Sequence, residues 1–158
     1  MIMSIAAFDL IEEFHSEDVM SLNHSRLIQK ISVKLEKFDA QYDIFPELEL
    51  ELNGIKVKPD ICIYPNLKID WLNDVIFMNN PPITAIEILS PKQALTDLTD
   101  KVMNVFLPSG VKSAWVVIPT VKTIYLFQPN QEVQTFSFHD TFTDPATDIS
   151  ITVAELFS

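Results

Sequence analysis

The chain has 158 residues, of which 47% are hydrophobic, and its 22 acidic and 11 basic side chains give a net charge of −11. This length and apolar content predict one domain, residues 1–158, with a sizeable core. Two glycines and one cysteine exclude a glycine-rich phosphate loop, an internal disulfide and a cysteine-rich zinc site. The negative charge argues against a general affinity for nucleic acid, although carboxylates that hold a cation can still meet a phosphate through it.

The sequence also carries an expectation about location. No positively charged segment precedes the short apolar stretch at residues 1–8, so a signal peptide is not expected. No apolar run approaches the roughly 20 residues that a membrane-spanning helix needs. The single cysteine, Cys62, fits a reducing compartment. We therefore expect a cytoplasmic protein.

The N-terminal third of the chain predicts two helices. Residues 8–14 are mainly apolar and predict one short helix. Apolar residues at helical spacing predict a longer helix over residues 23–38, with Ser21 and Asn23 as candidate N-caps. The lysines of this helix lie on another face, where solvation is more typical than contact with DNA.

Two strands joined by a hairpin are predicted next. Residues 42–52 alternate between acidic and apolar side chains, which indicates a strand with one solvent-facing side. Asn53-Gly54 is a hairpin turn signal. Residues 55–64 predict the returning strand, in which Pro59 cannot donate a hydrogen bond and so marks a bulge or bend. A long loop then leads to the next strand.

The second half is organised around one buried strand. Residues 82–89 are rich in Ile and bounded by prolines, which predicts a strand buried on both faces. A helix follows and ends at Pro108 to Gly110. This order of elements predicts an α/β fold with a central mixed β-sheet flanked by α-helices. Further elements are expected at residues 111–118, 123–127 and 133–138, which read as strands, and at residues 149–157, which read as a strand or a helix.

Two carboxylates interrupt these apolar strands. Glu87 lies between Ile86 and Ile88, and an ionised carboxylate in a buried strand is costly unless it is paired, hydrogen-bonded or bound to a metal. Asp60 stands at the border of the apolar part of its own strand. Glu87 therefore belongs to a strand end open to water, to a structural salt bridge or to a functional site.

The residues around these carboxylates form an ordered set of short motifs. They are Ser21-Leu-Asn-His24, Pro59-Asp60, Glu87-Ile-Leu-Ser-Pro91, Asp97-x-x-x-Lys101, Gly110-Val111 and Trp115-Val-Val-x-Pro119. Over about residues 20–128, this set resembles the Uma-type restriction endonuclease family of the PD-(D/E)XK phosphodiesterase superfamily. The resemblance implies a restriction-endonuclease-like core with a divalent-metal site at one edge of the sheet.

The same resemblance implies roles for individual residues. Asp60 and Glu87 would be the metal-binding carboxylates, and the backbone carbonyl of Ile88 would be a third oxygen ligand for Mg²⁺ or Mn²⁺. The usual lysine of the superfamily lies two residues after the glutamate, where this chain has Leu89. In this family the lysine stands on the following helix, which here means Lys101. It would orient or activate the attacking water.

Several alternatives stay open at this stage. Lys101 could instead form a surface ion pair with Asp97, one helical turn earlier. Lys92 is nearer to the glutamate but matches the motif less well. Glu47 either adds a third carboxylate or is solvated, and His24 either faces the site or caps and packs locally.

The functional expectation is a Mg²⁺- or Mn²⁺-dependent DNA endonuclease. A homodimer is plausible because one site cuts one strand and twofold nucleases cut two. The acidic charge and the missing strict lysine position favour two other interpretations: a non-catalytic interaction protein that retains the nuclease fold, and a hydrolase of small phosphodiesters.

Overall fold

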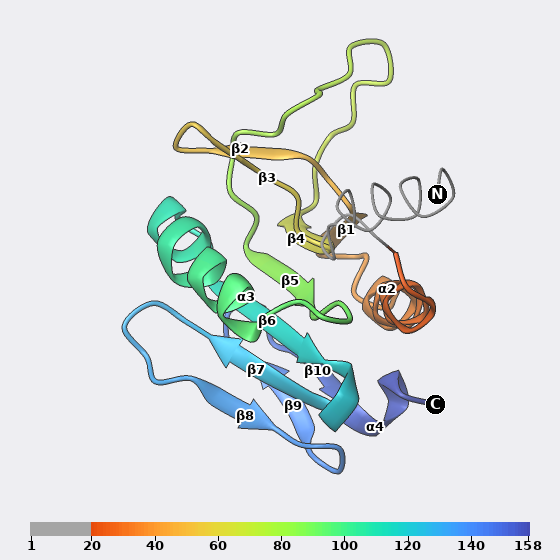
Figure 1. Cartoon of the computed structure of the whole chain (residues 1–158). Coiled ribbons are helices and arrows are strands. Elements are labelled where there is room, and N and C mark those ends of the chain that lie inside the picture. Colours follow the sequence, from red (N-terminus) through yellow and green to blue (C-terminus); the bar gives the residue numbers. More distant parts are fainter. Residues whose placement is uncertain (1–19) are drawn as a thin grey trace, which may run out of the picture.

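The computed structural model describes residues 20–158, so the short helix expected over residues 8–14 lies outside the described residues. Figure 1 shows a central sheet with helices and a separate hairpin around it. Among residues 20–158, no helix is both long and apolar enough to cross a membrane. The helices are α2 (Leu22–Glu36), α3 (Leu95–Lys101), which continues as a π-helix (Val102–Phe106) and a 3₁₀ turn (Leu107–Ser109), a second 3₁₀ turn (Pro119–Val121) and α4 (Val153–Leu156). The strands are β1 (Tyr42–Pro46), β2 (Leu50–Leu52), β3 (Ile55–Val57), β4 (Ile61–Pro65), β5 (Thr84–Ile88), β6 (Ser113–Ile118), β7 (Thr123–Phe127), β8 (Gln134–Phe136), β9 (Thr141–Asp144) and β10 (Ile149–Thr152).

The main sheet is mixed, as the sequence predicted. Its strand order is β1-β4-β5-β6-β7-β8. Only β5 and β6 pair in parallel, and α3 with its π-helical extension forms the crossover between them. The other neighbouring strands of this sheet pair antiparallel. A parallel pair needs such a crossover because a tight turn can join only antiparallel strands.

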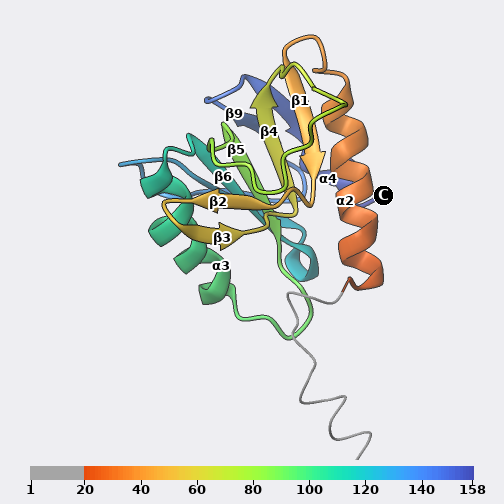
Figure 2. The same cartoon turned by 90° about the horizontal axis from the view of Figure 1, so that it is seen from above.

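Two apolar layers cover the sheet, one on each face. Ile86 and Ile88 of β5 face α2, β9, β10 and α4, whereas Ala85 faces α3 and β2. Figure 2 shows α2 and α3 on opposite sides of the sheet. Because side chains alternate along a strand, Glu87 points to the same face as Ala85, toward α3. The fold therefore directs this carboxylate toward the helix that carries Lys101.

Helix α2 begins where its capping signal predicts. The hydroxyl of Ser21 accepts a hydrogen bond from the backbone N–H of His24 at 3.3 Å, which satisfies one of the free donors of the first turn. Leu27, Ile31 and Leu35 are buried at helical spacing, which confirms the amphipathic pattern. On the outer face, Lys34 pairs with Glu155 at 2.8 Å.

The single strand expected over residues 42–52 is wrong. The chain forms β1, leaves the sheet at Glu47, whose φ is +54°, and starts a separate hairpin of β2 and β3. Asn53 and Gly54 have φ values of +51° and +79°, so the expected hairpin turn is confirmed. The single returning strand expected over residues 55–64 is also wrong, because β3 ends at Val57 and pairs with β2, whereas β4 starts at Ile61 and belongs to the main sheet. Pro59, where a bulge or bend was expected, lies between the two strands.

The C-terminal region contains one strand that the sequence analysis missed. Strand β9 pairs with β10, and α4 follows directly, so the end of the chain is both strand and helix. Asp144 at the end of β9 is completely buried. Its Oδ2 atom accepts hydrogen bonds from Ser113 Oγ at 2.5 Å and Trp115 Nε1 at 2.7 Å, and its Oδ1 atom accepts one from Ala146 N at 2.9 Å. These bonds fasten the β9–β10 pair to β6.

Candidate active site

The site forms where β4 and β5 separate. Their antiparallel ladder ends at the pair Ile61–Ile86, so Asp60 and Glu87 form no ladder pair with each other, although Glu87 and Ile88 remain paired with β6. Side-chain carboxylates accept hydrogen bonds from the backbone N–H groups of Asp60 and Ile88 at this point. Asp60 Oδ2 accepts from Ile88 N at 2.7 Å, and Glu87 Oε1 accepts from Asp60 N at 3.1 Å. Each acidic side chain therefore anchors the strand that carries the other, and the two carboxylates are held side by side.

Glu87 is the most buried charged group of this region, with 4% of its surface exposed. Lys101 Nζ lies 3.0 Å from Glu87 Oε2. Burial raises the pKa of Glu87 to about 7, with the negative charge of Asp60 adding to this effect and the Lys101 ammonium opposing it. A carboxyl group whose pKa is strongly raised beside a second carboxyl group marks a candidate for function rather than a purely structural pair.

Lys101 occupies the last turn of α3, on the side that faces the sheet. Its amine pairs with Glu87, while Asp97 is exposed and forms no ion pair among the described residues. The alternative interpretation, a surface ion pair of Lys101 with Asp97, is therefore wrong. Directly after Lys101 the helix widens into the π-helix, a type of turn that is rare and often found at functional sites.

His24 reaches the site from the first turn of α2. Its ring is buried, with Nδ1 lying 3.0 Å from Ser90 Oγ and Nε2 lying 2.9 Å from Asp60 Oδ1. The contact between His24 Nε2 and Asp60 Oδ1 lies within ion-pair distance, but its geometry is not that of a hydrogen bond. Ser90 is itself held by Gln93, whose Oε1 atom accepts from Ser90 N at 3.1 Å. Of the two roles left open for His24, the structure supports the one that faces the site.

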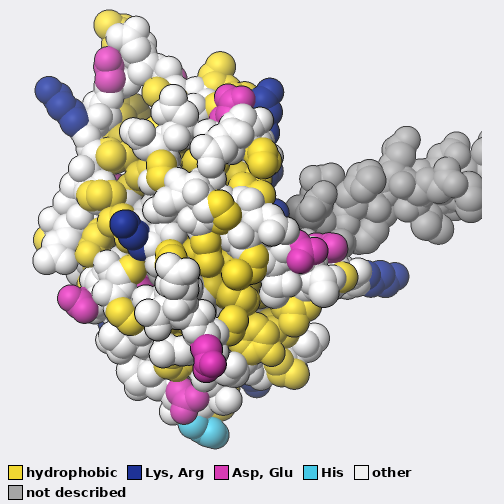
Figure 3. Space-filling view, turned by 90° about the vertical axis from the view of Figure 1, so that its left-hand side faces the viewer, with side chains coloured by type: hydrophobic (Ala, Val, Ile, Leu, Met, Phe, Trp, Pro, Cys, Tyr) yellow, Lys and Arg dark blue, Asp and Glu magenta, His cyan; other side chains and the backbone are white. Residues whose placement is uncertain are grey.

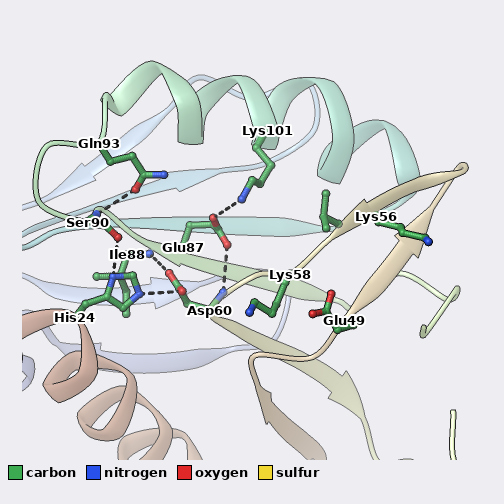
Figure 4. A pocket seen from close by; sticks show the side chains of 11 residues that line it. His24, Glu49, Lys56, Lys58, Asp60, Glu87, Ile88, Ser90, Gln93 and Lys101 are labelled. Atoms are coloured by element: carbon green, nitrogen blue, oxygen red, sulfur yellow. Dashed lines mark hydrogen bonds and ion pairs between the residues drawn. The ribbon is translucent and has the colours of Figure 1, made fainter. Parts of the chain in front are cut away.

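These side chains line one cavity of about 360 Å³. Figure 4 shows Asp60, Glu87 and Lys101 converging on it, with His24 and Ser90 at one end. The other end is walled by the β2–β3 hairpin and the segment that follows it. The cavity is lined there by Lys56, Lys58 and the acidic residue Glu49.

The remaining candidates lie elsewhere. The side chain of Glu47 is exposed and does not line the cavity, although its backbone N–H donates to the carbonyl of Asp60 at 2.9 Å. Lys92 is exposed, with a φ of +65°, and does not line the cavity either. The carbonyl of Ile88 faces the Asp60 side, because N–H and C=O of one strand residue point the same way and Ile88 N bonds to Asp60.

The residues of the cavity rim were not predicted from the sequence. Ser90 stands in the motif from Glu87 to Pro91 without a role of its own, and Gln93 carries no recognisable signal. Lys56 and Lys58 alternate with apolar residues in the expected strand over residues 55–64, which is typical of a solvent-facing side. Their approach to the site depends on the chain leaving the sheet at Glu47, a backbone change at a non-glycine residue that no local pattern announces.

Comparisons with known proteins agree with this architecture. A crystal structure of "a putative nuclease belonging to DUF820" from Anabaena variabilis superposes with a TM-score of 0.76 at 23% identity, covering 87% of this chain and 81% of the other. At that identity the likeness establishes the fold alone, a mixed α/β fold shared with that protein. A DrdV–DNA complex solved by cryo-electron microscopy also matches, with a TM-score of 0.43, 15% identity and coverage of 83% of this chain and 13% of the other. Comparison with curated proteins gives no match.

The family follows from the sequence itself. Residues 10–154 match the family model Uma2, whose description is "Putative restriction endonuclease". The chain belongs to this family. Its carboxylates and its mixed sheet are consistent with the PD-(D/E)XK superfamily that the motifs of the sequence resemble.

Proposed function

We propose that this protein is a divalent-metal-dependent endonuclease that hydrolyses phosphodiester bonds of DNA. The observation that carries the proposal is the convergence of Asp60, Glu87 and Lys101 on one cavity, from three separate elements of the fold. Two adjacent carboxylates and a lysine are the groups that metal-assisted phosphodiester hydrolysis requires. Membership of a nuclease family supports the same chemistry.

The donor atoms available at the cavity fit a hard cation. Asp60 and Glu87 offer carboxylate oxygens, and the carbonyl of Ile88 faces the same side. Among residues 20–158, no group of three or more His, Cys, Asp and Glu side chains converges to hold a metal ion. The oxygen donors of Asp60, Glu87 and Ile88 suit Mg²⁺ or Mn²⁺, which bind through one or two carboxylates and complete their shell with water and substrate phosphate. When bound, such an ion lowers the pKa of a water molecule and polarises the phosphoryl oxygens.

The chain's own residues supply the rest of the proposed reaction. Lys101 extends from the cavity wall, where its ammonium can orient the attacking water and offset charge on the phosphate. In hydrolysis the water oxygen bonds to phosphorus, one ester P–O bond breaks and the leaving oxygen takes up a proton. Asp60 and Glu87 hold each other's strands, so the reacting groups keep a fixed geometry.

A polyanionic substrate fits the positive groups at the cavity. Lys56, Lys58 and Lys101 line it, and of these only Lys101 has a carboxylate partner among the described residues. The other eight of the 11 Lys and Arg side chains do not line the cavity, and on the face in Figure 3 the charged side chains lie scattered around a band of hydrophobic ones. The lysines at the cavity therefore favour an extended phosphate backbone over a single small phosphodiester.

One observation favours the rival, a non-catalytic interaction protein. Both oxygens of Glu87 already have partners within the chain, Asp60 N and Lys101 Nζ. A site that neutralises itself in this way could persist as a structural pair. The proposed endonuclease therefore requires Lys101 to yield part of its contact with Glu87 when cation and substrate bind.

A cleavage assay separates the two functions. Purified protein is incubated with Mn²⁺ or Mg²⁺ and supercoiled plasmid, linear duplex, single-stranded DNA or a small phosphodiester. The proposal predicts nicking or linearisation that is lost with Lys101→Met and kept with Lys112→Met, an exposed lysine outside the cavity. Cleavage of the small phosphodiester alone would restrict the function to small substrates. No cleavage of any substrate by folded protein would favour the non-catalytic rival.

A further inference from the structure

A chain of polar contacts runs behind the candidate metal ligands. Ser90 Oγ lies 3.0 Å from His24 Nδ1, and His24 Nε2 lies 2.9 Å from Asp60 Oδ1. The contacts join the first turn of α2 to the end of β5 and the start of β4, which are distant in sequence. Nothing in the proposed hydrolysis uses His24, yet its ring is more than nine-tenths buried in the wall of the cavity.

The two nitrogens of His24 have different surroundings. Nδ1 is engaged by Ser90, whose own position is set by the hydrogen bond from its N–H to Gln93. This end of the ring is therefore anchored. Nε2 is buried without an aligned hydrogen bond, and its nearest charged neighbour is the Asp60 carboxylate. Ser90 satisfies one ring nitrogen, as any buried histidine requires, but the second nitrogen faces the carboxylate of Asp60 in the wall of the cavity.

The contact completes the restraint of Asp60. Asp60 Oδ2 accepts from Ile88 N at 2.7 Å, and Oδ1 faces His24. With one partner for each oxygen, the plane of the carboxylate is fixed. Its side chain is 18% exposed, so without His24 only the bond from Ile88 N would hold it, and Oδ1 could turn toward solvent.

We infer that His24, anchored by Ser90, is a positioning residue that holds the Asp60 carboxylate in the orientation needed to bind the divalent cation. The inference rests on the proposed function, because it assigns Asp60 to the cation. Partners behind metal ligands commonly change metal affinity by about 10- to 100-fold when they are removed. His24 acts through Asp60 and has no contact with the reacting atoms.

The test compares substitutions that differ only in where they place a polar group. In His24→Gln the side-chain amide can take the place of Nε2 beside Asp60, whereas in His24→Asn it stops near the place of Nδ1, and His24→Leu has no polar group. We expect Mn²⁺ affinity by calorimetry to stay within about 3-fold for Gln and to fall about 10-fold or more for Asn and Leu. The control is His139→Gln at an exposed histidine, with thermal melting to confirm folding.

A second readout works without metal. The chain has only three histidines, so the ring nitrogens of His24 can be assigned in a ¹⁵N correlation spectrum by their loss in His24→Gln. We expect Asp60→Asn to shift these signals and Asp97→Asn to leave them unmoved. If the ring signals of His24 do not shift in Asp60→Asn, the positioning role is overturned. Equal Mn²⁺ affinities of His24→Gln, His24→Asn and His24→Leu would also overturn it. Failure of the wild-type protein to bind Mn²⁺ with and without short duplex DNA, with the ring signals responding as expected, would overturn the proposed function and leave the positioning of Asp60 standing.

Discussion

Two regions of this protein bury carboxylates on neighbouring strands, and they solve the same physical problem differently. Asp144 has no exposed surface and receives hydrogen bonds from Ser113, Trp115 and Ala146. Asp60 and Glu87 share three donors between two carboxylates, lie against each other and line a cavity of about 360 Å³. Neutral donors satisfy the hydrogen-bonding capacity of Asp144. In the pair of Asp60 and Glu87, two carboxylates face a single ammonium group, which leaves negative charge beside the cavity.

The difference shows why burial alone does not identify a functional carboxylate. A buried acidic group that is fully hydrogen-bonded stabilises the fold, because removing it would leave its donors without partners. A buried pair of like charges costs stability unless a cation joins it. The two regions should therefore respond in opposite ways to the same chemical change, from Asp to Asn.

The largest expected effect is on catalysis at Asp60. Replacing Asp60 by Asn removes a charge that the proposed cation requires, and DNA cleavage should fall by about 10³-fold, or about 4 kcal/mol of transition-state stabilisation. The unfolding temperature should stay the same or rise, because repulsion between Asp60 and Glu87 is relieved. Plasmid-nicking rates and thermal melting measure the two quantities. A variant that loses stability and keeps its activity would reverse the comparison.

The next effect is on stability at Asp144. In Asp144→Asn the amide nitrogen must face a donor, either Ala146 N or the pair formed by Ser113 and Trp115. The free energy of unfolding should fall by about 2 kcal/mol. Urea denaturation measures this loss, and the cleavage rate per folded molecule should equal that of the wild-type protein. Unchanged stability would mean that the β9–β10 pair is not held by this carboxylate.

A smaller effect is expected at the rim of the cavity. Lys58→Glu removes a cation that has no carboxylate partner among residues 20–158, and it should raise KM for duplex DNA about 10-fold, about 1.4 kcal/mol, while leaving kcat little changed. The control is Lys68→Glu, an exposed lysine that does not line the cavity. Steady-state kinetics at two salt concentrations measure the effect. Equal KM values for both variants would show that Lys58 at the cavity rim does not contact the DNA.

The smallest expected effect is a pH dependence of the metal-free protein. The pKa of Glu87 is raised from 4.5 to about 7 by burial, so the folded state keeps a proton that the unfolded state loses earlier. Stability should therefore fall as pH rises from about 4.5 to about 7 and then level off. Glu87→Gln should flatten the profile, whereas Glu47→Gln at an exposed site should not. Melting curves in chelator from pH 4.5 to 8 decide this, and a wild-type profile no steeper than that of Glu87→Gln would refute it.

Sequence reasoning predicted the parts of the fold that local patterns encode. Helix α2 and strands β5 and β6 follow from apolar spacing, a capping serine and uninterrupted apolar runs. The departure of the chain at Glu47 was not predicted, because a positive φ at a non-glycine residue follows from tertiary contacts. Strand β9 was missed because four residues are too few for a clear alternation.

The candidate site was predictable only in part. Glu87 can be recognised from the sequence as an acidic residue inside an apolar strand, and Asp60 can be recognised because it follows a proline that interrupts a strand. Lys101 could be chosen over Lys92 only through the family resemblance, since periodicity alone favoured a pair with Asp97. The contact of His24 with Ser90 joins residues 66 positions apart, and no local pattern carries such information.

The most direct test of the central claim is calorimetric titration of Mn²⁺ into four proteins: wild type, Asp60→Asn, Glu87→Gln and Asp144→Asn. The same titrations are repeated with short duplex DNA in the Lys101→Met background, so that a site completed by DNA is also detected. The comparison of the two regions predicts saturable binding that is lost in the first two variants and retained in Asp144→Asn. Absence of binding at millimolar Mn²⁺ in every folded protein, with and without DNA, or equal binding in all four, would contradict it.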